Sequence, residues 1–281
     1  MKCFEKILVP VDFSINTNVA VKKAIDFAIP EFTEIHLLHV SESKKFMNLA
    51  GIVNTISNST ATTQADYLLN QLVWEIQNTH KNIKTVTQIR SGKNIQSEII
   101  NTSRHLKPDL IIIGKKNQHS LLPFLNTVIS EHLAVATDCP VLTVKPGSLN
   151  KKIETVVMPV CNSFPDKKMD VLCALDNKAL VNVHLLTILN NDEIPDNHSA
   201  SALLQSMKSI KKRINCNVQH CTIHSNNKAV ATLRYAEKVK ADILLISSKT
   251  EKNSPTWINR KELTDIVNPA SHLQVINVHT H

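Results

Sequence analysis

Residues 7–14 read ILVPVDFS, and residues 156–163 read VVMPVCNS, so an apolar run with a proline and a closing serine recurs 149 positions later. Four ordered matches of this kind indicate an internal repeat, and we interpret the chain as two copies of one unit. The offset falls from 148 to 133 after the second match, which makes the second copy shorter. The other matches pair residues 34–42 with 182–190, 108–116 with 241–249, and 139–145 with 273–279.

The boundary between the copies is predicted where turn-forming residues separate two apolar runs. Residues 146–152 read PGSLNKK, which is the composition of a linker. We therefore predict a first domain over residues 1–146, a linker over 147–152 and a second, shorter domain over 153–281. A chain of 281 residues is long enough for two domains that each bury a core.

Short apolar runs alternate with helical patterns inside each copy. Runs such as ILVPV, IHLLHV and LIIIG lack polar alternation, as strands buried on both faces do. Between strands, residues such as Val21, Ala24, Ile25 and Ala28 recur at the spacing of an amphipathic helix. A β-α-β-α-β-α-β-α-β order requires crossovers, which make the sheet mostly parallel with helices on both faces. We predict an α/β fold of two tandem doubly wound five-stranded sheets, with ligands bound at the carboxyl ends of the strands.

The expected elements can be placed on the sequence. Helices are expected over 17–29, 62–80, 94–105 and 124–136 in the first copy, and over 166–176, 200–214, 227–239 and 258–267 in the second. Strands of the second copy are expected near 154–160, 182–188, 217–223, 242–247 and 273–278.

Composition excludes several classes of protein. Hydrophobic residues make up 42% of the chain and charged residues 20%, as in an ordinary globular protein. No apolar window approaches the roughly 18 residues of a membrane helix, and Glu5, Lys6 and Pro10 interrupt the N-terminal run. We therefore expect a cytoplasmic protein. The net charge of +8 is spread over both copies without a long basic run, which argues against a nucleic-acid partner.

The cysteines and histidines do not form a metal site in this interpretation. The six cysteines contain no CxxC pair, and we expect reduced thiols. Cys216, His220 and His224 share one face of a predicted strand, but positions four apart lie about 13 Å apart at about 3.3 Å per residue. They cannot converge on one ion with ligand distances near 2 Å. Cys161, just after a strand of the second copy, is interpreted as a small buried thiol rather than a reactive one.

Five short motifs follow one another through the first copy. They are Val9-Pro10-Val11-Asp12 with Ser14, His39-Val40, Arg90-Ser91-Gly92, Pro108 to Gly114, and Cys139 to Val144. Their order and spacing resemble those of the universal stress protein family, over the whole first copy and more weakly over the second. The resemblance implies an adenine nucleotide alpha hydrolase-like fold in each copy. It also implies a pseudo-dimer in which the copies pair through their fifth strands, 140–145 and 273–278.

The same resemblance implies a nucleotide site and shows where this chain departs from it. In ATP-binding members, the positions of Asp12 and Val40 lie beside the nucleoside, and Gly114 is the first glycine of a G-x-x-G-x(9)-G-(S/T) phosphate loop. The second glycine falls on Asn117, the third on Thr127 and the hydroxyl position on Val128. Asn117 can keep the turn, but a β-branched residue and a valine do not present bare amides or a hydroxyl to phosphate.

Lysines offer a second way to hold phosphate in the first copy. Lys115 and Lys116 could supply positive charge, although flexible ammonium groups do not replace oriented backbone donors. We interpret them as solvated loop residues. In the second copy, Cys161 replaces the aspartate, Ser247 and Ser248 stand where Gly114 stands, and no glycine follows residue 147.

We therefore expect a non-enzymatic, cytoplasmic stress-response protein that binds a protein partner or a small ligand, with the phosphate loop largely lost in both copies. No cofactor is assigned, and ATP stays open as a ligand of the first domain only. A further homodimer of the tandem chain also stays open. Two alternatives remain: an ATP-binding regulatory switch that uses Asp12, Val40 and the Gly114 region, and a weak small-molecule hydrolase. No nucleophile elbow, P-loop or dinucleotide fingerprint occurs in the sequence.

Overall fold

The computed structural model describes residues 3–42, 58–115, 128–149, 151–160, 166–176, 180–192, 197–248 and 272–279. The chain divides into two compact units. We call Phe4–Ile129 the N-terminal unit, and Ser130–His281 together with Met1–Cys3 the C-terminal unit. Residues 124–127 of the helix predicted over 124–136, and the whole helix predicted over 258–267, lie outside the described residues. Among the described residues, no helix is long and apolar enough to cross a bilayer.

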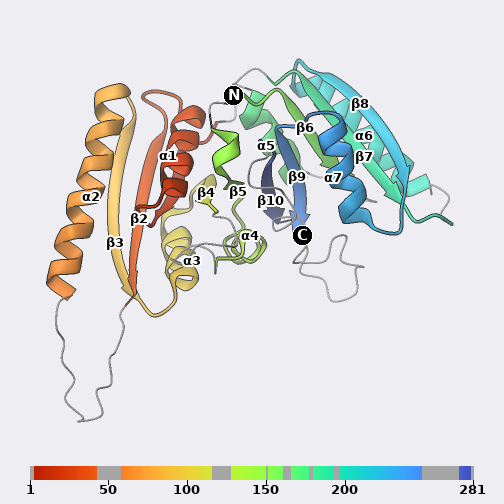
Figure 1. The fold of residues 1–281 in the computed structure, drawn as a ribbon. Coiled ribbons are helices and arrows are strands. Elements are labelled where there is room, and N and C mark those ends of the chain that lie inside the picture. Colours follow the sequence, from red (N-terminus) through yellow and green to blue (C-terminus); the bar gives the residue numbers. More distant parts are fainter. Residues whose placement is uncertain are drawn as a thin grey trace, which may run out of the picture. The chain divides into compact units, whose positions relative to one another are not determined.

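The N-terminal unit is a parallel sheet with helices packed against it (Figure 1). Its strands are in the order β3-β2-β1-β4, and every pairing is parallel. β4 is buried throughout, as an uninterrupted apolar run predicts. The elements are β1 (Lys6–Val11), α1 (Ile15–Phe27), β2 (Glu34–Glu42), α2 (Asn58–Thr79), β3 (Lys84–Gly92), α3 (Ile95–Leu106) and β4 (Leu110–Gly114).

The C-terminal unit repeats this arrangement and adds one antiparallel strand. Its strand order is β5-β10-β9-β6-β7-β8, and only the β5–β10 pairing is antiparallel among the pairings described. The elements are α4 (Ser130–Thr137), β5 (Val141–Val144), the 3₁₀ turn η1 (Pro146–Ser148), β6 (Thr155–Pro159), α5 (Asp166–Asp176), β7 (Asn182–Leu189), α6 (Asn197–Arg213), β8 (Asn217–His224), α7 (Lys228–Lys238), β9 (Ile243–Ser248) and β10 (Gln274–His279). The predicted α/β class and mostly parallel sheets are confirmed.

The pairing of β5 with β10 has the register of a two-fold axis. Leu142 is opposite Ile276, and Ile276 is also its counterpart in the sequence repeat at an offset of 134. Thr143 is opposite Val275, while Val141 is opposite Asn277, so each strand presents the same positions to the other. This is the pattern of an isologous contact. The prediction that the two copies pair through their fifth strands is therefore confirmed.

Because β5 pairs with β10, α4 and β5 belong to the C-terminal unit, although the sequence repeat assigns them to the first copy. The predicted domain limits, 1–146, 147–152 and 153–281, describe the sequence repeat and stay a prediction. The predicted linker begins with an ordered turn. Ser148 is fully buried, and its hydroxyl donates to the Lys145 carbonyl at 2.7 Å.

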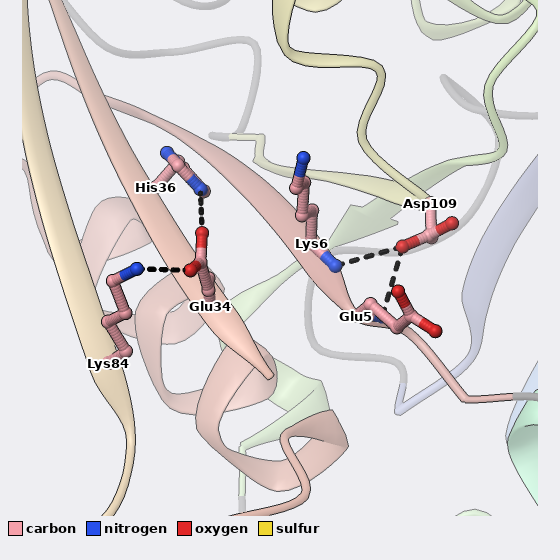
Figure 2. A network of polar contacts seen from close by, with 6 residues as sticks. All are labelled: Glu5, Lys6, Glu34, His36, Lys84 and Asp109. Atoms are coloured by element: carbon pink, nitrogen blue, oxygen red, sulfur yellow. Dashed lines mark hydrogen bonds and ion pairs between the residues drawn. The ribbon is translucent and has the colours of Figure 1, made fainter. Parts of the chain in front are cut away.

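One aspartate in each copy holds the start of the first strand. Asp109 Oδ2 accepts hydrogen bonds from the backbone N–H groups of Glu5 and Lys6, at 3.0 and 2.9 Å (Figure 2). Asp242 is its counterpart 133 positions later in the repeat. Its Oδ2 accepts hydrogen bonds from the backbone N–H groups of Glu154 and Thr155, at 2.9 and 3.0 Å. The aspartate of the recurring Pro-Asp-Leu or Ala-Asp-Ile motif is thus a structural clamp between strands.

A second polar cluster lies at the same end of the N-terminal sheet. Glu34 accepts from Lys84 on the neighbouring strand and contacts His36 Nε2 at 3.2 Å (Figure 2). The hydrogen bond from Lys84 holds the pKa of Glu34 below its usual value. Burial lowers the pKa of His36. These residues stand at the amino ends of β2 and β3, away from the edge where doubly wound sheets bind ligands.

Candidate functional site

A small hollow lies at the carboxyl ends of β1 and β2. The parallel register brings Val11, the last residue of β1, opposite His39 in the C-terminal half of β2, so these two segments meet at one edge of the sheet. The hollow is shallow, with a volume of about 10 Å³, which is room for about one water molecule. It is lined by Pro10, Val11, Asp12, Leu38, His39, Val40 and Ile95. Asp12 and Val40, two of the residues predicted from the sequence, are therefore brought together.

Asp12 organises the turn that leads from β1 into α1. Its Oδ1 accepts from the Ser14 N–H at 3.0 Å and from the Thr17 hydroxyl at 2.7 Å. Its own N–H donates to Thr17 Oγ1 at 3.0 Å. Phe13, between these residues, has a φ of 58°, a conformation that a side chain other than glycine seldom adopts. The carboxylate thus shapes the turn and at the same time forms part of the wall of the hollow.

His39 adds a second polar group to the same wall. Its Nδ1 lies 2.9 Å from the Val11 carbonyl oxygen, which can only accept, so Nδ1 carries the proton. In the neutral ring Nε2 is then an acceptor. The Phe13 ring lies against the imidazole, with centroids 4.7 Å apart. The hollow therefore combines a carboxylate and an imidazole with apolar walls from Leu38, Val40 and Ile95.

Gly114, the third predicted residue, has a packing role. A Cβ at this position would lie 2.1 Å from the backbone oxygen of Asn16 in the first turn of α1. Such an approach is far shorter than any van der Waals contact, so only glycine lets α1 pack on the end of β4. Gly114 does not line the hollow.

The residues after β4 are described only in part. Lys115 is half-buried directly after the strand. Lys116 and the predicted site residues Asn117 and Thr127 lie outside the described residues. Val128, at the position expected to carry a hydroxyl, is fully buried in the core.

The backbone N–H group of Ile129, the residue after Val128, already has a hydrogen-bond acceptor within the protein. The Ile129 N–H donates to Gln96 Oε1 at 2.8 Å, from the first turn of α3. Ile129 immediately precedes α4, the place where a helix N-terminus would offer amides to an anion. The carboxamide oxygen of Gln96 stands where a phosphate oxygen would have to bind this N–H.

The corresponding strand end of the second copy differs in charge. Cys161 lies outside the described residues. Lys168 of α5 is 3% exposed, and its ammonium donates to the Pro159 carbonyl at 2.8 Å. This end of β6 therefore has a buried cation close by, and the position corresponding to Asp12 is a cysteine.

His220 of β8 lies beside threonine hydroxyls rather than other metal-ligating side chains. His220 Nε2 lies 3.3 Å from both the Thr187 and Thr222 hydroxyls, and burial lowers the pKa of His220. Within the described ranges, no three His, Cys, Asp or Glu side chains stand close enough to hold an ion. Cys216, directly before this strand, has its pKa raised to about 11 by burial and the nearby charge of Asp176.

Comparison with known proteins identifies the family of the chain. Residues 4–145 match the sequence model of the universal stress protein family. The chain belongs to the universal stress protein family. A universal stress protein from Methanocaldococcus jannaschii is 28% identical over 156 residues, which cover 50% of this chain and 95% of that protein.

Solved structures extend the likeness of fold to both copies. The crystal structure of a universal stress protein from Archaeoglobus fulgidus covers 98% of both chains with a TM-score of 0.69 at 18% identity. A universal stress protein family protein from Arabidopsis thaliana, solved with AMP bound, covers 50% of this chain and 90% of its own at 17% identity, with a TM-score of 0.33. At that similarity, AMP binding is a property of the Arabidopsis protein alone.

Sequence reasoning missed three residues of this region. His39 belongs to a quoted motif, but its hydrogen bond to Val11 depends on the strand register. Ile95 reaches the hollow only because α3 starts beside β2. Gln96 carries no sequence signal, because a glutamine in the first turn of a helix is usually a solvated side chain.

Proposed function

We propose that this universal stress protein is a non-enzymatic, cytoplasmic stress-response protein that acts by binding a protein partner or a small ligand, and that its phosphate loop has largely lost its function. The observation that carries the proposal is the Gln96–Ile129 hydrogen bond. It supplies the N–H before α4 with an acceptor from within the protein. An incoming phosphate would have to break this contact before binding there.

Two further observations support the loss of phosphate binding. Val128 is buried, so the position expected to offer a hydroxyl contributes to the core instead. Gly114 is accounted for by its contact with Asn16 and needs no phosphate to explain it. What remains at the strand ends is the shallow hollow with Asp12 and His39, where a ligand would lie across the surface and donate hydrogen bonds to these polar groups.

Calorimetric titration of the full chain tests the proposal. We expect no heat with ATP at millimolar concentration. Micromolar ATP binding that Asp12→Asn abolishes would overturn the proposal, because a nucleotide would then use the first domain. Asn keeps an oxygen to accept from Ser14 and Thr17, so the turn should survive while the charge is removed.

A second candidate function is the ATP-binding switch. It is favoured by one observation, that Asp12 and Val40 line the same hollow, as the family resemblance predicts. Gln96→Ala separates the candidates. If the phosphate loop can still bind phosphate and Gln96 only blocks the Ile129 N–H, removing the carboxamide should reveal ATP binding. If the loop is lost, Gln96→Ala should bind ATP no better than the native chain.

A further inference from the structure

The outer face of α2 carries two exposed aromatic rings. The inner residues Ala65, Leu69 and Ile76 are buried where the helix packs on β2 and β3. On the outer side, Tyr67 is 63% exposed and Trp74 is 67% exposed. Residues seven apart lie on the same side of a helix, so the rings form one stripe. Figure 1 shows α2 as a helix that flanks β3 within the N-terminal unit.

The charged side chains of α2 beside this stripe are acidic. α2 has 22 residues, and its only charged side chains are Asp66 and Glu75. Both are exposed, and neither has an ionic partner among the described residues. In a chain of net charge +8, a helix with two acids and no base is a local exception. A partner for this face should present cations together with some apolar surface.

The equivalent helix of the second copy has the opposite character. α6, like α2, connects the second and third strands of its copy. It contains no acidic residue. Leu204 is 57% exposed, and Lys208 and Lys211 follow it at the spacing of one helix face. Lys212 and Arg213 are also exposed, and none of these cations has an ionic partner in the described part of the chain.

We propose that the α2 face of one chain docks on the α6 face of a second copy. Trp and Tyr are common anchors of interfaces, and Lys side chains pack their stems along aromatic rings with the ammonium over the ring face. The acids of α2 and the cations of α6 complement each other, whereas other parts of two +8 chains repel. The contact joins unlike surfaces of the two chains, so it is heterologous.

Sedimentation velocity of the full chain tests this contact. We expect association at protein concentrations up to about 100 μM, the range of weak interfaces, and dissociation as salt screens the charges. Trp74→Ala removes an anchor without a charge change and should weaken association at least about tenfold. Far-UV circular dichroism checks that each variant is folded.

Charge exchange makes the test specific. Asp66→Lys/Glu75→Lys and Lys208→Glu/Lys211→Glu should each abolish association, and the chain that carries all four changes should regain it because the charges are complementary again. Glu5→Lys/Glu237→Lys is the matched control for Asp66→Lys/Glu75→Lys, since it adds the same positive charge at exposed positions outside the two faces. A chain that stays monomeric, an association that survives these variants, or a fourfold variant that fails to recover would overturn the proposal. A basic helix of another protein would then be the remaining occupant.

Discussion

The two aspartate clamps offer a matched experiment on the value of burial. Asp109 and Asp242 are repeat counterparts, each accepting two backbone hydrogen bonds at 2.9–3.0 Å. Their own N–H groups also donate to equivalent carbonyls, those of Lys6 and Thr155, at 2.9 Å. They differ in environment, because Asp242 is 9% exposed and Asp109 lies on the surface. Substituting each aspartate by alanine removes the same two bonds from two different surroundings.

The expected magnitudes follow from what replaces the lost acceptor. In Asp109→Ala, water reaches the N–H groups of Glu5 and Lys6, so the loss should be about 0.5–1 kcal/mol. In Asp242→Ala, the N–H of buried Thr155 loses a charged acceptor and cannot be fully resolvated, so the loss should be about 2–4 kcal/mol. A difference of about 2 kcal/mol is roughly a 30-fold change in the unfolding equilibrium constant.

Urea unfolding of the full chain, followed by far-UV circular dichroism, measures both losses. If the two units unfold separately, each variant should shift its own transition. If they unfold together, the midpoints of the two variants should still differ by the expected amount. Asp109→Asn and Asp242→Asn keep an acceptor oxygen and serve as controls, with smaller losses at both positions. Equal losses for the two alanine variants would refute the reasoning, because burial would then not decide the strength of the clamp.

Gln274 on β10 is 1% exposed, and neither its Nε2 nor its Oε1 has a hydrogen-bond partner among the residues that the structure describes. Gln274→Met, similar in volume, should therefore raise the thermal midpoint by an amount equivalent to about 1–2 kcal/mol. A lower midpoint would contradict this. At a pKa of about 11, roughly a thousandth of Cys216 is thiolate at pH 8. Iodoacetamide should therefore label Cys216 at least about tenfold more slowly than Cys3, as measured by mass spectrometry. Equal labelling rates would be inconsistent with the burial of Cys216. Burial lowers the pKa of His184 below 6.5, so the unfolded chain takes up that proton first and stability should fall as pH drops from 6.5 toward the lowered pKa. His184→Asn, which keeps an acceptor for the Tyr235 hydroxyl, should reduce that fall in urea titrations at pH 7 and pH 5, and an unchanged pH dependence would assign it to other groups.

Much of the architecture could be predicted because its signals are local. A strand buried on both faces needs an apolar run, and the runs at 7–11, 35–40 and 110–114 became β1, β2 and β4. The family resemblance implied that the fifth strands pair, and the register of β5 with β10 is that of a two-fold axis. For the same reason, Asp12 and Val40 could be placed at one edge, because the carboxyl ends of parallel strands meet there.

Other features depend on contacts between residues far apart in sequence, and no local pattern encodes them. Gly114 was expected beside a phosphate, but its need for glycine comes from the backbone of Asn16, which approaches only after α1 has packed on β4. Gln96 lies 33 positions from Ile129, and the register of two elements brings them together. The sequence alone thus determined most of the elements, the repeat and the edge of the sheet at which doubly wound folds bind their ligands. The tertiary structure decided which donors and acceptors at that edge are already used, because hydrogen bonding there depends on ångström distances between segments that the chain joins only through folding.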